Sequence, residues 1–230
     1  EILLRINQST PWKNFNNDKD EPTINQFESK IGWELKEGNF TFKPFTNEGE
    51  KFKIKITKGL YRYTGKIIEE RNDIAVLGGS IALGFGVNDE DTFSSLLQKK
   101  INDYNIKNYG TGGYGTYQSL LKLEKILLKK NKIKYIIAVY TQAHEIRNIG
   151  EEAWLRTLSQ YSNRGHVYLP FATIDSQEKL KRHEPVKYIS LPLRENFAII
   201  NKIEKRIMKI IFYSKNRDPI KTTIKIFDEM

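Results

Sequence analysis

The sequence predicts an α/β fold in which helices cover both faces of a parallel sheet. Three short apolar runs, at Ile74–Leu77, Ile106–Tyr109 and Tyr135–Tyr140, are separated by two segments in which apolar residues recur at helical spacing. Strands and helices that alternate in this way form right-handed parallel crossovers, which build a three-layer, doubly wound sheet. We therefore expect one main α/β domain, preceded by a small β-rich subdomain.

The first 66 residues are expected to form this subdomain and an arm. Residues 1–30 are polar and irregular, and Trp12 and Phe15 are candidate anchors that pin an extended arm to the body. Residues 31–63 contain stretches in which apolar and polar residues alternate, which predicts half-buried antiparallel strands. The α/β domain then covers residues 67–230.

Two helices are expected between the three parallel strands. The first covers about Asp91–Tyr104, and the acidic run Asp89–Asp91 suits its positive amino end. The second covers Thr116–Lys130, with inward-facing leucines and Lys in its last turn. Each helix has the length of an ordinary crossover between parallel strands.

The remainder of the chain is expected to be mainly helical. Glu151–Tyr161 and Glu195–Phe212 have helical spacing, whereas the proline-containing segment Asn163–Pro192 is expected to be a loop. A last helix begins at Asp218, with Asp as the cap and Pro in the first turn, and still continues at Met230. Because a doubly wound sheet needs a further strand there, we expect the natural protein to extend beyond this residue.

Composition excludes several classes of function. Of the 38 basic residues only ten are Arg, so the net charge of +10 comes mainly from dispersed Lys, and no nucleic-acid-binding motif is present. We therefore expect no nucleic-acid partner. With no cysteine, the chain has no disulfide, thiolate nucleophile or Cys-ligated metal. Neither glycine pattern of nucleotide-binding loops follows the first strand, and no cofactor or metal is expected.

The turn Gly78-Gly79-Ser80 is the first candidate site. It follows the first buried strand, and Ser80 is the first side chain of the turn. A serine at the carboxyl end of a central parallel strand occupies a position suited to a nucleophile. The alternative is a strand-to-helix turn in which the serine hydroxyl only binds the local backbone.

Two further loops are expected at the same edge of the sheet, because ligands of parallel sheets bind beyond the carboxyl ends of the strands. They are residues 108–115, rich in glycine, and residues 141–148, which contain a histidine. Together with Ser80 they supply a hydroxyl, unhindered backbone N–H groups, an amide and an imidazole. An acyl-transfer site is built from these groups.

The motifs of these loops resemble those of the SGNH (GDSL-like) hydrolase family. The resemblance covers about residues 73–148 and includes Gly78-Gly79-Ser80 and the later Asn108-Tyr-Gly-Thr-Gly-Gly113. It implies a flavodoxin-like three-layer fold. It also implies that Ser80 is the nucleophile, and that the N–H groups of Ser80 and Gly113 bind the oxyanion. Asn108 and Gly110 match the Asn-x-Gly of the family and would line the substrate site together with Tyr114.

Two positions depart from the family pattern. Gly79 replaces the usual Asp of the first block, and the third block lacks the Asn that donates a hydrogen bond to the oxyanion. Gln142 or His144 would take the place of this Asn, and Arg147 and Asn148 would line the opening of the same substrate site. A neutral His144 would act as a donor or a base. Alternatively, it ties the loop to the backbone.

The Asp-x-x-His block that supplies the family's base is absent from this chain. The residues three before His144, His166 and His183 are Thr, Asn and Leu. Either the base lies in a part of the protein beyond this chain, or the protein binds its ligand without cleaving it. A third alternative is that His166 or His183 serves as the base from the expected loop.

The resemblance implies a serine esterase or an O-acyl (O-acetyl) transferase, acting on a small-molecule or carbohydrate ester through an acyl-enzyme at Ser80. The alternative is an inactive relative that binds a glycan or a partner. Trp33, Trp154 and Tyr114 would form a sugar platform in either case, unless they are packing residues. Related enzymes imply an extracytoplasmic or membrane-associated protein, with any membrane anchor outside this chain.

Overall fold

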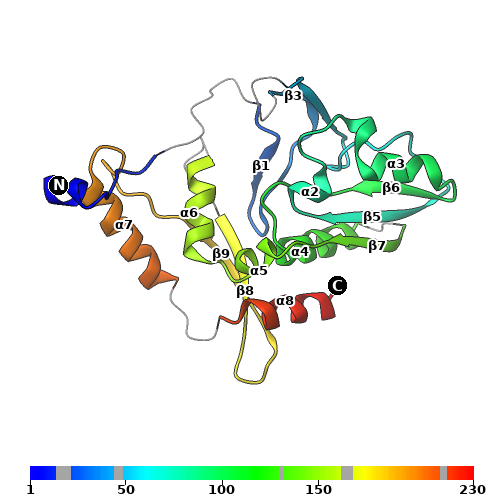
Figure 1. The fold of residues 1–230 in the computed structure, drawn as a ribbon. Coiled ribbons are helices and arrows are strands. Elements are labelled where there is room, and N and C mark those ends of the chain that lie inside the picture. The colour runs from blue at the N-terminus through cyan, green and yellow to red at the C-terminus, as the bar shows by residue number, and fades with distance from the viewer. Residues whose placement is uncertain (14–21, 44–48, 130–131, 162–167, 213–216) are drawn as a thin grey trace.

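The structure, a computed structural model, describes residues 1–13, 22–43, 49–129, 132–161, 168–212 and 217–230. It is a mixed α/β fold that combines a three-stranded parallel sheet with small antiparallel sheets (Figure 1). The predicted α/β class is thus confirmed at this level. In the described part of the chain, no helix combines the length and the apolar character needed to cross a membrane.

The parallel sheet has the strand order β6-β5-β7. Its strands are β5 (Asn72–Gly78), β6 (Tyr104–Asn108) and β7 (Ile133–Val139). The crossover helices are α3 (Phe93–Lys100) and α4 (Thr116–Leu127). On β5, Ile74 and Val76 face the cluster that contains Leu97 of α3, whereas Ala75 and Leu77 pack with Leu123 of α4. The alternation of β5 side chains therefore places one helix on each face of the sheet, as predicted.

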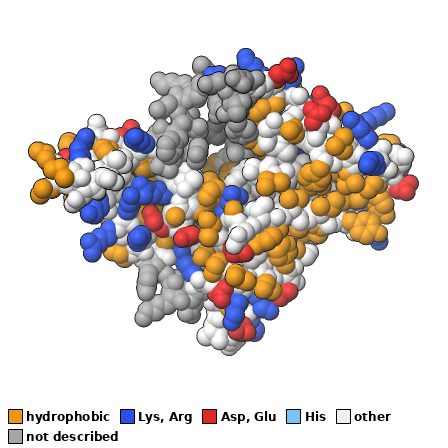
Figure 2. All heavy atoms as spheres, viewed as in Figure 1, with side chains coloured by type: hydrophobic (Ala, Val, Ile, Leu, Met, Phe, Trp, Pro, Cys, Tyr) orange, Lys and Arg blue, Asp and Glu red, His pale blue; other side chains and the backbone are white. Residues whose placement is uncertain are grey.

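Strand β7 differs from the buried strand that its apolar sequence suggests. It pairs only with β5 among the described strands, and the side chain of Tyr135 is 52% exposed. Hydrophobic side chains accordingly gather over this part of the surface in Figure 2. Parallel strands are usually covered on both faces. Strand β7 is therefore unusual, because it is an edge strand of the parallel sheet and part of its face is exposed.

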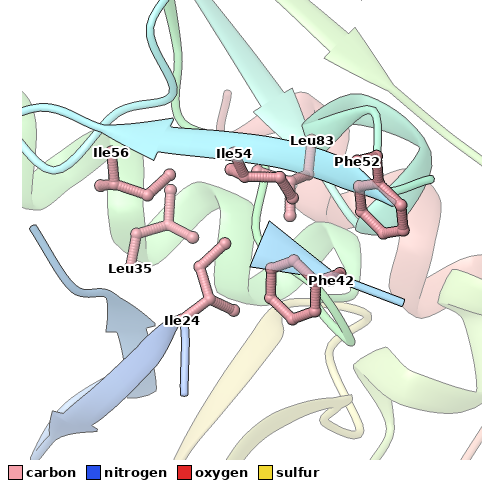
Figure 3. Close-up of a cluster of buried hydrophobic side chains, with 7 residues drawn as sticks. All are labelled: Ile24, Leu35, Phe42, Phe52, Ile54, Ile56 and Leu83. Atoms are coloured by element: carbon pink, nitrogen blue, oxygen red, sulfur yellow. The ribbon is translucent and has the colours of Figure 1, made fainter. Parts of the chain in front are cut away.

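The amino-terminal subdomain consists of two hairpins. One joins β1 (Asn25–Glu28) to β2 (Gly32–Leu35), and the other joins β3 (Gly38–Phe42) to β4 (Phe52–Ile56). Alternate residues of β4 are buried, which confirms the predicted antiparallel pattern. Their side chains share one hydrophobic cluster with Leu83 (Figure 3). The packing therefore crosses the boundary predicted at residues 66 and 67.

Arg62 connects this subdomain to the parallel sheet. Its backbone forms bridges to Ile56 at the end of β4 and to Asn108 at the end of β6. Its guanidinium is fully buried and donates hydrogen bonds to the carbonyl oxygens of Leu83 (2.9 Å) and Gly84 (2.7 Å). These carbonyls lie at the end of α2 (Ser80–Leu83), so Arg62 fixes the short helix that begins with the candidate nucleophile.

The arm begins with a short helix, α1 (Ile2–Ile6), rather than as an extended chain. The prediction that Trp12 anchors the arm is confirmed, since its indole is buried and the guanidinium carbon of Arg194 lies 3.7 Å from its ring centroid. Phe15, the other predicted anchor, lies outside the described residues.

The remaining elements lie to the left of the parallel sheet and below it in Figure 1, away from α3. They are α5 (Ala143–Asn148), α6 (Glu152–Tyr161), β8 (Tyr168–Ile174), β9 (Leu180–Lys187), α7 (Ala198–Ile211) and α8 (Pro219–Asp228). Helices α6, α7 and α8 agree with the predicted segments, whereas α5 lies in residues 141–148, which were predicted to form a loop. At the start of α8, the Asp218 side chain accepts a hydrogen bond from the N–H of Lys221, as expected for a cap.

The prediction of a loop over Asn163–Pro192 is wrong, because β8 and β9 form an antiparallel hairpin there. Pro170 and Pro185 suggested a loop because proline cannot donate to a strand ladder. In the structure the hairpin register shifts between Leu169 and Phe171, so Pro170 lies at an irregularity that needs no N–H donor.

Candidate active site

Ser80 lies where β5 turns into α2, at the carboxyl edge of the parallel sheet. It is the first residue of α2, and Gly79 is the cap residue before it. The side chain of Ser80 is partly exposed, and its hydroxyl has no hydrogen-bond partner among the described residues. The Ser80 hydroxyl therefore does not bind the local backbone, as it would in the alternative interpretation of this turn.

The turn before Ser80 requires glycine at position 78. Gly78 has a φ of +145°, and a methyl group there would lie 2.7 Å from the carbonyl oxygen of Val139 on β7. The glycine thus lets β5 approach β7 closely up to the last residue of the strand. Its carbonyl oxygen accepts a hydrogen bond from the N–H of Thr111, which brings the second glycine loop against the turn.

Gly113 lies in this second loop with a φ of +83°. A methyl group at Gly113 would lie 3.2 Å from the Trp33 ring and 3.6 Å from the Trp154 ring, so two indoles flank this backbone. The Trp33 Nε1–H donates to the carbonyl oxygen of Gly112 and holds the loop. No described residue accepts a hydrogen bond from the Gly113 N–H, which leaves this donor free.

His144 lies beside the Ser80 turn. A methyl group on Gly79 would lie 3.2 Å from Nε2 of His144 and 3.2 Å from the carbonyl oxygen of Tyr114. Burial, together with the positive charge of Arg147, lowers the pKa of His144 to about 4. The imidazole is therefore neutral at pH 7, and its Nδ1 forms a hydrogen bond of 3.3 Å with Oγ1 of Thr116.

Arg147 is the cation of this site. Its Nη1 donates to the carbonyl oxygen of Tyr114 at 2.9 Å and would lie 3.3 Å from a methyl group on Gly79. Its guanidinium carbon lies 4.3 Å from the ring centroid of Trp154. The crowding around Gly79 explains why this residue is glycine, because a larger side chain here would meet both His144 and Arg147.

Several predicted substrate contacts are occupied within the fold instead. Asn108 is fully buried, and its amide bonds to Ala82, Ser94 and Gly110. Gly110 is packed so tightly that a methyl group would lie 2.3 Å from the backbone nitrogen of Leu83. Asn108 and Gly110 therefore fix α2 against the sheet.

Tyr114 and Asn148 are occupied within the fold as well. The hydroxyl of Tyr114 donates to the carbonyl oxygen of Trp33, and the ring is buried. The amide of Asn148 accepts from the N–H of Tyr117 and donates to Oγ1 of Thr223. Tyr114 is thus a packing residue, and Asn148 joins α4, α5 and α8.

The remaining predicted residues do not meet Ser80. Gln142 is exposed at the cap of α5, whereas the buried ring of His144 lies against the turn. His183 stacks on Phe171 and bonds to Thr173, and both contacts lie on the β8–β9 hairpin. His166 lies outside the described residues.

Sequence reasoning missed two residues that position the site. Thr116, the first residue of α4, holds the His144 ring through Nδ1. Arg62 holds the far end of α2, with no local sequence signal beyond its position between two predicted strands. In the described chain, no group of three or more His, Asp or Glu side chains is arranged to hold a metal ion.

No protein-family model matches this chain, and no curated protein matches it.

Proposed function

We propose that the protein is a serine-dependent ester-processing enzyme of the SGNH type, an esterase or O-acyltransferase with Ser80 as its nucleophile. One arrangement carries this proposal: the Ser80 turn contacts His144 and the backbone of Tyr114, the residue next to Gly113. The Ser80 hydroxyl has no hydrogen-bond partner among the described residues, and the residue before it lies against the neutral His144 imidazole and the loop that carries the free Gly113 N–H. This set of groups suits nucleophilic attack on a carbonyl.

In the proposed reaction, Oγ of Ser80 attacks the ester carbonyl carbon, and the carbonyl oxygen becomes an oxyanion. The N–H groups of Ser80 and Gly113 donate to this oxyanion. His144 supplies a third donor from Nε2 when the Thr116 hydroxyl donates to Nδ1, since the neutral ring carries a single N–H. The proton of the Ser80 hydroxyl passes to the leaving oxygen, so that collapse expels the alcohol and leaves an acyl-enzyme, from which water or a sugar hydroxyl takes the acyl group.

His144 is assigned to the oxyanion and not to the base for a physical reason. A pKa of about 4 makes the ring a poor acceptor for the serine proton, because general bases work best with a pKa near the working pH. The ring contacts of His144 include Thr116 and Tyr140 but, among the described residues, no carboxylate that would stabilise an imidazolium. We assign the base to no residue of the described chain.

A fluorophosphonate probe tests the proposal directly, because it labels activated serine nucleophiles. We expect labelling of the wild-type protein, retention of labelling in the control Ser29→Ala, and loss in Ser80→Ala. Ser29 is exposed in the amino-terminal subdomain and far from the turn in sequence. An unlabelled wild type, or equal labelling of the two variants, contradicts the nucleophile assignment. Acetylated oligosaccharides are the first substrates to assay, with acetate release as the readout.

A second function, ligand binding without turnover, is favoured by a different observation. The Arg147 Nε and Trp154 Nε1 atoms are buried and have no acceptor among the described residues. Buried donors are normally paired, so an oxygen-rich ligand such as a glycan that separates the Arg147 guanidinium from the Trp154 ring would satisfy them. Calorimetric binding of an acetylated oligosaccharide, with no acetate released and no probe labelling, would favour this function over catalysis.

A further inference from the structure

A cavity of about 500 Å³ lies between the end of the arm and α7, and cations line it. Lys202, Lys205, Arg206 and Lys209 follow one another at helical spacing along one face of α7. The opposite wall comes from residues 8–10, which contribute polar side chains. In Figure 1, α7 lies well apart from α2, so this cavity is separate from the Ser80 site.

None of the four cations forms an ion pair with a described residue. Elsewhere on α7, Glu204 is already bound by Arg194 and Tyr188, and it is buried on another face of the helix. Burial, with Arg156 next, lowers the pKa of Lys205 even though Glu152 opposes this shift. Lys and Arg side chains gather over the α7 region in Figure 2. Within the described chain, the four cations therefore line the cavity without a salt-bridge partner.

The shape and lining of the cavity indicate the chemistry of its ligand. Lys202 and Lys209 are seven positions apart, about 10 Å along the helix axis, so the cations match a ligand with more than one anionic group. No aromatic side chain of the described residues lines the cavity, so there is no stacking platform for a nucleobase. Lys and Arg bind phosphate oxygens through charge-assisted hydrogen bonds. From the clustered cations and the cavity we infer a binding site for a phosphate-bearing anion.

Two sources of phosphate fit this site: a free phosphorylated molecule and the headgroup of an anionic lipid. Helix α1 packs on α7 and leaves Ile2, Leu3 and Ile6 at least 70% exposed. Figure 2 shows these hydrophobic side chains at the amino-terminal tip of the molecule, near the cations. A headgroup bound in the cavity would place this tip against the acyl boundary, whereas a free phosphate would not involve it.

The test uses three variants of the whole chain. The first replaces the four cavity cations with Gln. The second, a matched control, removes four exposed charges elsewhere through Lys51→Gln, Lys58→Gln, Lys99→Gln and Lys100→Gln. The third carries Ile2→Ser, Leu3→Ser and Ile6→Ser, which alters no buried side chain. Thermal unfolding confirms that each variant is folded.

Inorganic tripolyphosphate is titrated by calorimetry, and vesicles of phosphatidylcholine with or without phosphatidylglycerol are tested by co-sedimentation. We expect the cavity variant to lose affinity for at least one probe by roughly tenfold or more, and the matched control to lose little. Binding of tripolyphosphate that survives the α1 substitutions identifies a free ligand. Binding confined to anionic vesicles and weakened by the α1 substitutions identifies a headgroup. Equal losses in the cavity variant and the control, or no binding of either probe, overturn the inference.

Discussion

The Nε of Arg62 donates a hydrogen bond of 2.8 Å to Oδ1 of Asp89, and the Arg62 side chain is completely buried. The same guanidinium also binds the carbonyl oxygens at the end of α2. One side chain from the connection after β4 therefore holds both the helix that begins with Ser80 and the loop that follows it. This residue couples the amino-terminal subdomain to the candidate site.

Replacing Arg62 should destabilise the protein strongly. Arg62→Met removes the guanidinium donor from several carbonyl groups and leaves the Asp89 carboxylate with only the N–H of Lys55 as a described donor, and loss of one partner of a buried ion pair costs about 3–5 kcal/mol. The matched control is Arg5→Met, which breaks an exposed ion pair of the same 2.8 Å length with Glu1 and should cost under about 1 kcal/mol. Urea unfolding measures both, and similar losses would contradict the role of burial.

Two glycines of the second loop should respond differently to alanine. Gly110→Ala places a methyl group 2.3 Å from a backbone nitrogen of α2, which cannot move aside as a side chain would. We expect a loss on the order of 3 kcal/mol, together with loss of any Ser80 labelling, because α2 must shift. Gly112→Ala meets nothing within 4 Å and should be close to neutral in a thermal unfolding assay. An unaffected Gly110→Ala protein would show that the loop is not packed as described.

His144 should make stability depend on pH. Its pKa falls from 6.5 to about 4 on folding, so the unfolded chain binds the proton more tightly. The free energy of unfolding should therefore decrease as pH falls from about 6.5 towards 4, by up to about 3 kcal/mol. His144→Gln should remove this component in urea unfolding at pH 7 and pH 4.5.

His183 needs a control in that experiment, since burial and nearby Lys181 lower its pKa in the same direction. The protein with His144 and the His144→Gln variant are therefore compared in a His183→Gln background. If the slope of stability against pH is the same for both proteins in that background, the imidazole is not buried in the neutral form.

Substitutions of His144 should also show whether this residue acts as a hydrogen-bond donor or as a base in catalysis. His144→Gln keeps a hydrogen-bond donor, whereas His144→Leu does not. If His144 donates to the oxyanion, the Leu variant should lose about 10²–10³-fold in kcat and the Gln variant clearly less. Equal and severe losses in both variants would favour a base. The assay is acetate release, with probe labelling of Ser80 as the check on nucleophile integrity.

The part of the fold in which strands and helices alternate was predictable, because the local hydrophobic pattern and the tertiary packing agree there. Three short apolar runs separated by two helical segments had one simple interpretation, and in the structure Ile74 and Val76 indeed face one helix and Ala75 and Leu77 the other. The placement of Ser80 after β5 followed from the same pattern. Local pattern and tertiary structure coincide here.

The rest depended on contacts between distant residues. Pro170 argued locally for a loop, yet the hairpin accommodates it at a register shift. The burial of Asn108 and the five-acceptor environment of Arg62 arise from segments that are remote in sequence. His144 was recognised, but its neutral state depends on burial and on Arg147, which spacing along the chain does not reveal.

The central position of β5 also sets an order in time. Both of its parallel partners, β6 and β7, follow it in the chain, and Gly78 pairs with Val139 on the later strand. At ordinary rates of synthesis, the ribosome takes roughly several seconds to add the residues between Gly78 and Val139. During that interval the nascent Ser80 turn has no completed sheet beneath it. Newly made chains would therefore depend on chaperones most between the synthesis of β5 and that of β7.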